Sequence, residues 1–171
     1  MHAPRARRER GRRRQIHASA IKRVTRGHRS VWFVEVDAHL LERIGQAVSG
    51  SVERAERARA AADLIRDGTG QRWVGIYTVT ESSVVNEAWS GPGPPAFPMF
   101  QRERGLTAHA LRTRSQALSD DVANDPRYLA NQDDPGSELI LPVIRDEQVV
   151  GTLDVESDEL GAFDGTLIAQ L

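Results

Sequence analysis

The sequence predicts an α+β fold, with a mainly antiparallel sheet and helices packed on one face. Apolar residues repeat at three- and four-residue intervals over residues 37–66, as in amphipathic helices. From Trp73 onward, the pattern changes to β-branched and aromatic runs joined by short links. Links this short favour hairpins, so neighbouring strands are expected to run antiparallel. Helices and strands in this order form one α+β layer.

Two helical stretches open the predicted domain. Asp37 is expected to cap the first, whose apolar stripe is Leu40, Leu41, Ile44, Ala47 and Val48. The second runs from Val52 to Arg66 with an alanine-rich face, and Gly68 and Gly70 are expected to end it. These helices either cover the sheet or form half of a dimer seam. The run from Val31 to Val34, just before them, is either a strand or a staple for the first helix.

The rest of the chain predicts strands, loops and two short helices. Strands are expected over residues 73–79, 83–89, 116–119, 138–144 and 148–155, and helices over 106–111 and from Asp164. Loops are expected over 91–98 and 120–135, the second with one helical turn at 126–129. A tight turn at Asp146 and Glu147 joins the last two strands, and Pro142 must lie at a bulge or an unpaired position. The last helix stops in mid-pattern, so it is either short or truncated.

Charge divides the chain into two parts. Residues 1–30 hold eleven Lys and Arg and one acid, Glu9, whereas residues 31–171 hold 12 bases and 23 acids. The first part is expected to be a disordered basic tail, or the product of a start site placed too early. Nucleic-acid binding through its arginines is the functional alternative. The second part is expected to be a single domain, with its core at about 38–171.

Composition excludes several classes of function. No apolar run approaches the roughly 18 residues of a membrane span, and no export signal is present, so the cytoplasm is the default location. The chain has no cysteine, which excludes disulfides, thiolate metal sites and thiol nucleophiles. The histidines lack metal-ligand spacing, so no metal site is expected.

Successive blocks of the chain resemble those of GAF domains in order and spacing over residues 38–171. They are Trp73-Val74-Gly75-Ile76-Tyr77, Arg104-Gly105-Leu106-Thr107, Ser119-Asp120-Asp121-Val122, Asp125-Pro126-Arg127-Tyr128-Leu129, Ser137-Glu138-Leu139-Ile140-Leu141-Pro142-Val143, Val150-Gly151-Thr152-Leu153-Asp154-Val155-Glu156-Ser157 and Ala162-Phe163-Asp164. The resemblance implies a sensory or regulatory domain for signal transduction, homodimeric as GAF domains usually are. It also implies a small-molecule pocket between the sheet and two covering segments, 91–101 and 120–136.

Within that family, the chain is most similar to the free methionine-(R)-sulfoxide reductases. Their mechanism needs an attacking thiolate and a resolving cysteine. The matching positions here are Thr107 and, some six residues before the Ser137-Glu138 pair, a position near Asn131. A hydroxyl cannot form the sulfenic intermediate or a disulfide, and a chain without thiols cannot attach a bilin through a thioether. The resemblance therefore implies a non-catalytic relative, with a divergent reductase-like enzyme as the alternative.

Three acidic residues, Glu138, Asp154 and Glu156, match positions that hold the ligand's ammonium group in those reductases. This predicts a pocket that kept its amine-binding groups and lost the redox step. The alternative is structural, since carboxylates at these positions also cap loops and tie strands together.

Other candidates for the pocket come from the covering segments and the short helix. Trp89, Phe97, Met99 and Phe100 either line the ligand pocket or form an apolar lid over the core. Tyr128 belongs to the second covering segment. His109, next to Asp121, is a candidate general base or haem ligand, and its alternative is a structural or exposed histidine.

Overall fold

The computed structural model describes residues 22–26, 29–33, 38–49, 51–129 and 134–163. Its centre is a six-stranded sheet in the order β5-β4-β3-β8-β7-β6, with every neighbouring pair antiparallel. This confirms the predicted α+β class. The strands are β3 (Trp73–Val79), β4 (Ser83–Ser90), β5 (Met99–Gln101), β6 (Ala117–Ser119), β7 (Ser137–Arg145) and β8 (Gln148–Ser157).

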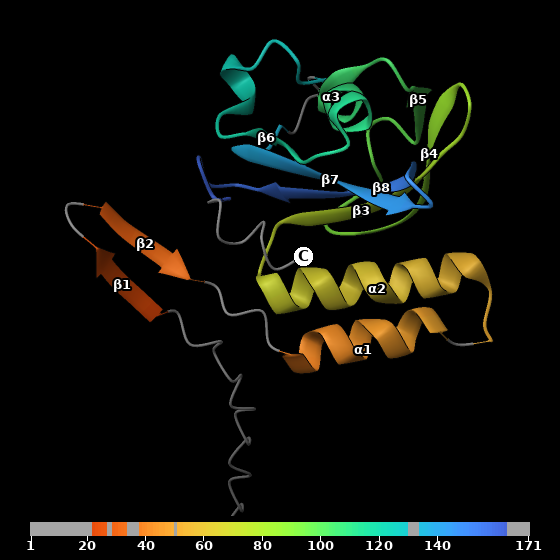
Figure 1. Cartoon of the computed structure of the whole chain (residues 1–171), viewed down its shortest axis with the longest axis horizontal. Helices are drawn as coiled ribbons and strands as arrows, with labels where there is room; N and C mark the ends of the chain where they lie inside the picture. The colour runs from red at the N-terminus through yellow and green to blue at the C-terminus, as the bar shows by residue number, and fades with distance from the viewer. Residues whose placement is uncertain (1–21, 27–28, 34–37, 50, 130–133, 164–171) are drawn as a thin grey trace, which may run out of the picture.

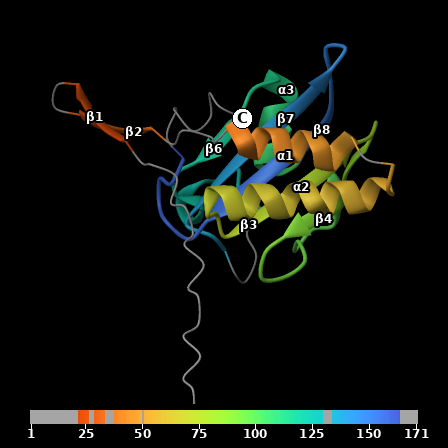
Figure 2. The same ribbon diagram turned by 90° about the horizontal axis from the view of Figure 1, so that it is seen from below.

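Helices α1 (Ala38–Ser49) and α2 (Arg54–Thr69) lie side by side across one face of this sheet (Figures 1 and 2). The helix α2 packs its apolar stripe directly on the strands. The core on this side is Ala62, Ile65, Val74, Leu139, Val155 and Phe163.

Gly68, predicted to end the second helix, lies instead within the last turn of α2. A Cβ at this position would collide with the Leu40 side chain of α1, so Gly68 allows the two helices to approach closely. Gly70 ends α2 in the left-handed conformation, and its N–H donates to the Arg66 carbonyl over 2.8 Å.

The opposite face of the sheet carries α3 (Gly105–Thr113) and the irregular segments (Figure 1). Leu106 and Ala110 of α3 pack on Ala117 and Ile140. The expectation that helices share one face therefore holds for α1 and α2, whereas α3 joins the covering loops. A cavity can form on this side because the cover is incomplete.

The β7–β8 hairpin projects beyond the rest of the sheet. Its turn residues Asp146 and Glu147 both have positive φ, at 50° and 61°, as a two-residue type I′ turn requires. Strand β6 pairs with β7 only as far as Ile140. Pro142 therefore lies where one side of β7 has no partner, which accommodates its missing N–H.

The single turn expected at 126–129 begins one residue earlier. The Tyr128 N–H donates to the Asp125 carbonyl over 3.0 Å, and the Asp125 carboxylate accepts the backbone N–H of Arg127 over 2.9 Å. The 3₁₀ helix η1 (Val122–Asn124), which was not predicted, comes just before this turn.

Near the N-terminus, β1 (Lys22–Arg26) and β2 (Arg29–Phe33) form a separate two-stranded hairpin, so Val31 to Phe33 belong to a strand. The remainder of the basic segment, the Asp37 cap and the helix from Asp164 lie outside the described residues. Within the described ranges, no helix is long and apolar enough to cross a membrane.

Candidate functional site

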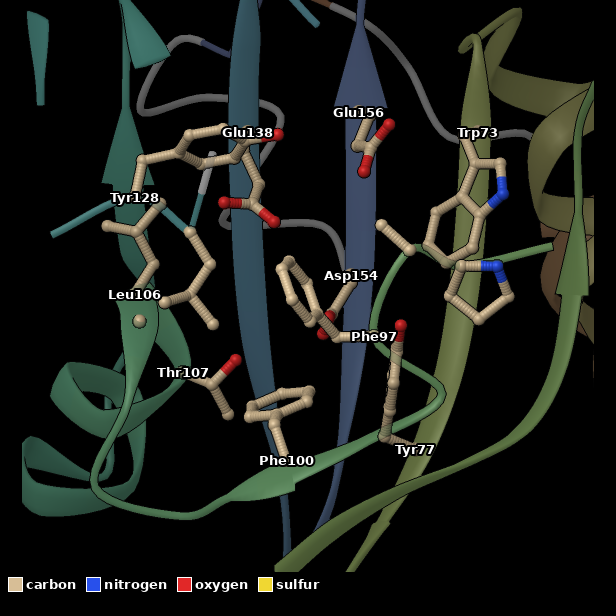
Figure 3. A pocket seen from close by; sticks show the side chains of 14 residues that line it. Trp73, Tyr77, Phe97, Phe100, Leu106, Thr107, Tyr128, Glu138, Asp154 and Glu156 are labelled. Atoms are coloured by element: carbon tan, nitrogen blue, oxygen red, sulfur yellow. The ribbon is translucent and has the colours of Figure 1, made fainter. Parts of the chain in front are cut away.

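A cavity of about 70 Å³ lies between the sheet and the cover formed by α3 and residues 91–101 (Figure 3). It opens toward a wider groove of about 510 Å³, with which it shares Trp73, Pro95, Ala96 and Glu156. The lining residues are Trp73, Tyr77, Pro95, Ala96, Phe97, Phe100, Gly105, Leu106, Thr107, Tyr128, Leu129, Glu138, Asp154 and Glu156.

Three carboxylates enter this cavity from two neighbouring strands. Glu138 of β7 lies directly opposite Glu156 of β8, and Asp154 is two residues back along β8. Alternate residues of a strand point to the same face, so antiparallel register brings all three acids to one side. Figure 3 shows them together on the sheet floor of the cavity.

The Asp154 side chain is buried, and those of Glu138 and Glu156 are half-buried. Burial raises the pKa of Asp154 to about 8 and that of Glu156 to about 7. Burial, reinforced by repulsion from Asp154 and Glu156, also raises the pKa of Glu138 well above its usual range. Desolvation and like charges both disfavour the ionised form, so these groups take up a proton or a cation near neutral pH.

Asp154 is the most isolated of the three. The residue is only 6% exposed, and its Oδ1 atom has no hydrogen-bond partner in the described part of the chain. Arg72 lowers the pKa of Glu156, opposing the effect of burial. The Arg72 guanidinium also pairs with Asp158 over 3.0 Å.

Aromatic rings form the walls. Tyr77 and Phe100 meet edge to face, with ring centroids 5.9 Å apart. Gly75 lies between Trp73 and Tyr77 on β3, and a Cβ there would collide with both rings. The Trp73 Nε1–H donates to the Gly93 carbonyl over 3.0 Å, which ties the proline-rich loop to the sheet beside the cavity. Burial among these groups and repulsion by Asp154 raise the pKa of the Tyr77 phenol well above its usual range, so it stays protonated.

The GAF domain model matches residues 41–171, which include the whole sheet and the cavity. The chain belongs to the GAF domain family. GAF domains are small-molecule-binding domains, and the cavity lies under the two segments expected to cover the pocket.

Similar proteins include both plain GAF proteins and reductases. GAF domain-containing protein A of Dictyostelium discoideum is 28% identical over 74% of this chain and 79% of its own. Free methionine-R-sulfoxide reductase of Saccharomyces cerevisiae is 30% identical over 54% of this chain, and the match spans only 52% of that enzyme. The structure of free methionine-R-sulfoxide reductase from Neisseria meningitidis, in complex with its substrate, is 25% identical. The comparison of that structure with this chain gives a TM-score of 0.67 and covers 81% of this chain and 86% of the Neisseria chain.

The structure brings seven of the eleven candidate residues of this GAF domain into the cavity lining. They are Phe97, Phe100, Thr107, Tyr128, Glu138, Asp154 and Glu156. Thr107 lies in the first turn of α3 and is buried. Burial and repulsion by Glu138 raise the pKa of Tyr128 well above its usual range, so this phenol also remains neutral.

The other four candidates do not line the cavity. The Trp89 ring lies 5.7 Å from the Arg59 guanidinium carbon of α2, and Met99 is 66% exposed. The Asp121 carboxylate accepts a hydrogen bond from the side-chain amide of Asn124 over 2.7 Å, within the loop around η1. His109 lies on the outer side of α3, in a separate groove.

Three lining residues, Trp73, Tyr77 and Leu106, were not among the candidates predicted from the sequence. All three lie within the blocks that resemble GAF domains. Trp73 and Tyr77 alternate with Val74 and Ile76, and strand alternation places them on the carboxylate face. That alternation was a signal available in the sequence. The described residues hold no cluster of three His, Cys, Asp or Glu positioned for a metal ion.

Proposed function

We propose that this GAF domain is a non-catalytic module that binds a small, positively charged molecule bearing an amine, for a sensory or regulatory purpose. The observation that carries the proposal is Asp154. Its carboxylate is buried in the cavity with one oxygen unpaired, beside two further acids.

An ammonium group is the chemical partner that suits the three carboxylates on the floor of the cavity. An ionised carboxylate without a partner is costly to bury, and an ammonium supplies both the opposite charge and hydrogen-bond donors. The aromatic walls add to the preference, because the faces of Trp73, Tyr77 and Phe100 attract cations. A neutral ligand would leave the carboxylates to be neutralised by protons alone.

Catalysis is the weaker candidate. Thiol-dependent sulfoxide reduction needs cysteine, and the chain has none. Thr107, at the position of the thiol in the related motif, offers a hydroxyl in place of the thiol. The histidine of α3, His109, lies in the outer groove, and its Nδ1 is 3.3 Å from Nη2 of Arg112.

Calorimetric titration of the full chain tests the binding proposal. The panel pairs primary amines and amino acids, including methionine and methionine sulfoxide, with uncharged compounds of the same shape. We expect saturable heat with at least one amine, none with its neutral counterpart, and a loss of at least about tenfold in affinity in Asp154→Asn. Asp120→Asn, on an exposed loop, serves as the matched control and should bind normally.

Two outcomes would contradict the proposal. One is that no amine binds, or that neutral analogues bind as tightly as amines. The other is turnover of free methionine sulfoxide in a thioredoxin-coupled assay, which would make this GAF domain an enzyme with chemistry independent of thiols.

A further inference from the structure

A second hollow, distinct from the cavity, lies on the outer side of α3. It has a volume of about 310 Å³ and runs between α3 and the turn that follows η1. We call it the α3 groove. Its lining residues are Glu103, Arg104, Gly105, Ala108, His109, Arg112, Pro126, Arg127, Tyr128 and Leu129.

The α3 groove is basic within an acidic domain. Residues 31–171 hold 12 arginines and 23 acids. Three of those arginines, Arg104, Arg112 and Arg127, line this one groove, whereas Glu103 is the single acidic residue that lines it. A net positive hollow on a negative domain concentrates anions locally.

One of the three arginines is already engaged. Arg127 donates from Nη2 to the Asp125 carboxylate over 2.6 Å and to the Leu118 carbonyl over 2.9 Å. This contact with Arg127 lowers the pKa of Asp125 to about 2, so the pair is ionised at neutral pH. Arg127 therefore forms a fixed wall of the groove.

Arg104 and Arg112 differ from Arg127 in their ion pairing. Both are exposed, and neither forms an ion pair with any residue that the structure describes. The Arg112 guanidinium can only donate, so the His109 Nδ1 it contacts at 3.3 Å accepts.

We propose that the α3 groove binds a compact oxyanion, the phosphate or carboxylate group of a small molecule, held by Arg104 and Arg112. A guanidinium presents paired N–H donors that match two oxygens of such a group. The site is independent of the amine proposal. It adjoins the cavity, however, because Gly105, Tyr128 and Leu129 line both.

NMR titration of the full chain, at constant ionic strength, tests this site with inorganic phosphate and with acetate. We expect saturable shifts at the amides of residues 104–112. We also expect the double variant Arg104→Gln and Arg112→Gln to weaken binding by at least about tenfold. Arg145→Gln, which removes one arginine charge from the exposed β7–β8 hairpin, should bind like the parent chain.

The two probes distinguish the sources of the oxyanion. Tighter binding of phosphate indicates a phosphorylated ligand, and tighter binding of acetate indicates a carboxylate; either supports the site. The proposal is overturned if neither anion gives saturable shifts, or if Arg145→Gln weakens binding as much as the double variant. Unchanged near-UV circular dichroism of the variants establishes that they remain folded.

Discussion

Replacing Asp154 with Asn should stabilise the ligand-free domain, and by an amount that depends on pH. Burial raises the pKa of this carboxyl from 3.8 to about 8. At pH 7 the gap from the unfolded value is about 3 pH units. At about 1.4 kcal/mol per unit, Asp154 then destabilises the fold by on the order of 4 kcal/mol.

The sign of the pH dependence follows from the raised pKa. The native state holds the proton more tightly, so the destabilisation is absent below about pH 4, grows as pH rises, and levels off above about pH 8. Asparagine is neutral throughout and removes this dependence.

Urea unfolding of the parent chain and Asp154→Asn, at several values from pH 4 to pH 8, measures the difference directly. The free energies of unfolding should be close at pH 4 and separate by a few kcal/mol at pH 7, with the variant more stable. Asp120→Asn, in an exposed loop, should follow the parent chain at every pH. Parallel curves for the parent chain and Asp154→Asn would refute the claim that burial raises the pKa of this carboxyl in the folded state.

Three other predictions address the site, the packing and the assembly. Amine affinity should rise between pH 6 and pH 8, because the ammonium pairs with the ionised forms of Asp154 and Glu156, whose pKa values are about 8 and about 7; calorimetry showing a flat profile would contradict this. Gly151→Ala should cost about 2 kcal/mol in urea unfolding, because its Cβ would lie 2.5 Å from a backbone oxygen of β3. Gly45→Ala on α1, with nothing within 4 Å, should instead stabilise by about 0.5–1 kcal/mol, and equal effects would refute the packing argument. Val48, 48% exposed on the outer side of α1, should lie in a homodimer seam, so Val48→Asp should halve the mass measured by light scattering; an unchanged mass, or a monomeric parent chain, would exclude that seam.

The sheet was predictable because its signals are local. Local residue patterns identified every strand of the sheet except β5, and the Asp146–Glu147 turn joined the last two in the observed register. The short helix 106–111 was also found, but not its side of the sheet. That side depends on whether Leu106 and Ala110 pack with Ile140 or with Leu139, one residue apart on opposite faces of β7. Such a choice is made by tertiary packing.

The carboxylates on the floor of the cavity were predictable from the sequence, whereas the aromatic residues of its walls were less so. The acids Glu138, Asp154 and Glu156 occupy fixed positions in paired strands, so identifying the strands also placed the acids. Met99 and Phe100 are neighbours in β5, and strand alternation gives them opposite sides; only Phe100 reaches the cavity. Trp89 is also aromatic and in sequence near the loop, but its ring lies against Arg59 of α2. An aromatic residue near a pocket loop does not by itself specify which neighbour it will contact.

Native mass spectrometry of the full chain, freshly purified and then offered the amine panel, tests most directly whether this GAF cavity holds a cation. We expect one small basic molecule per protomer, retained from the cell or bound from the panel, and its loss in Asp154→Asn with the fold preserved. Retention of only neutral or acidic compounds, an adduct equally abundant on Asp154→Asn, or no adduct with any amine would contradict the account.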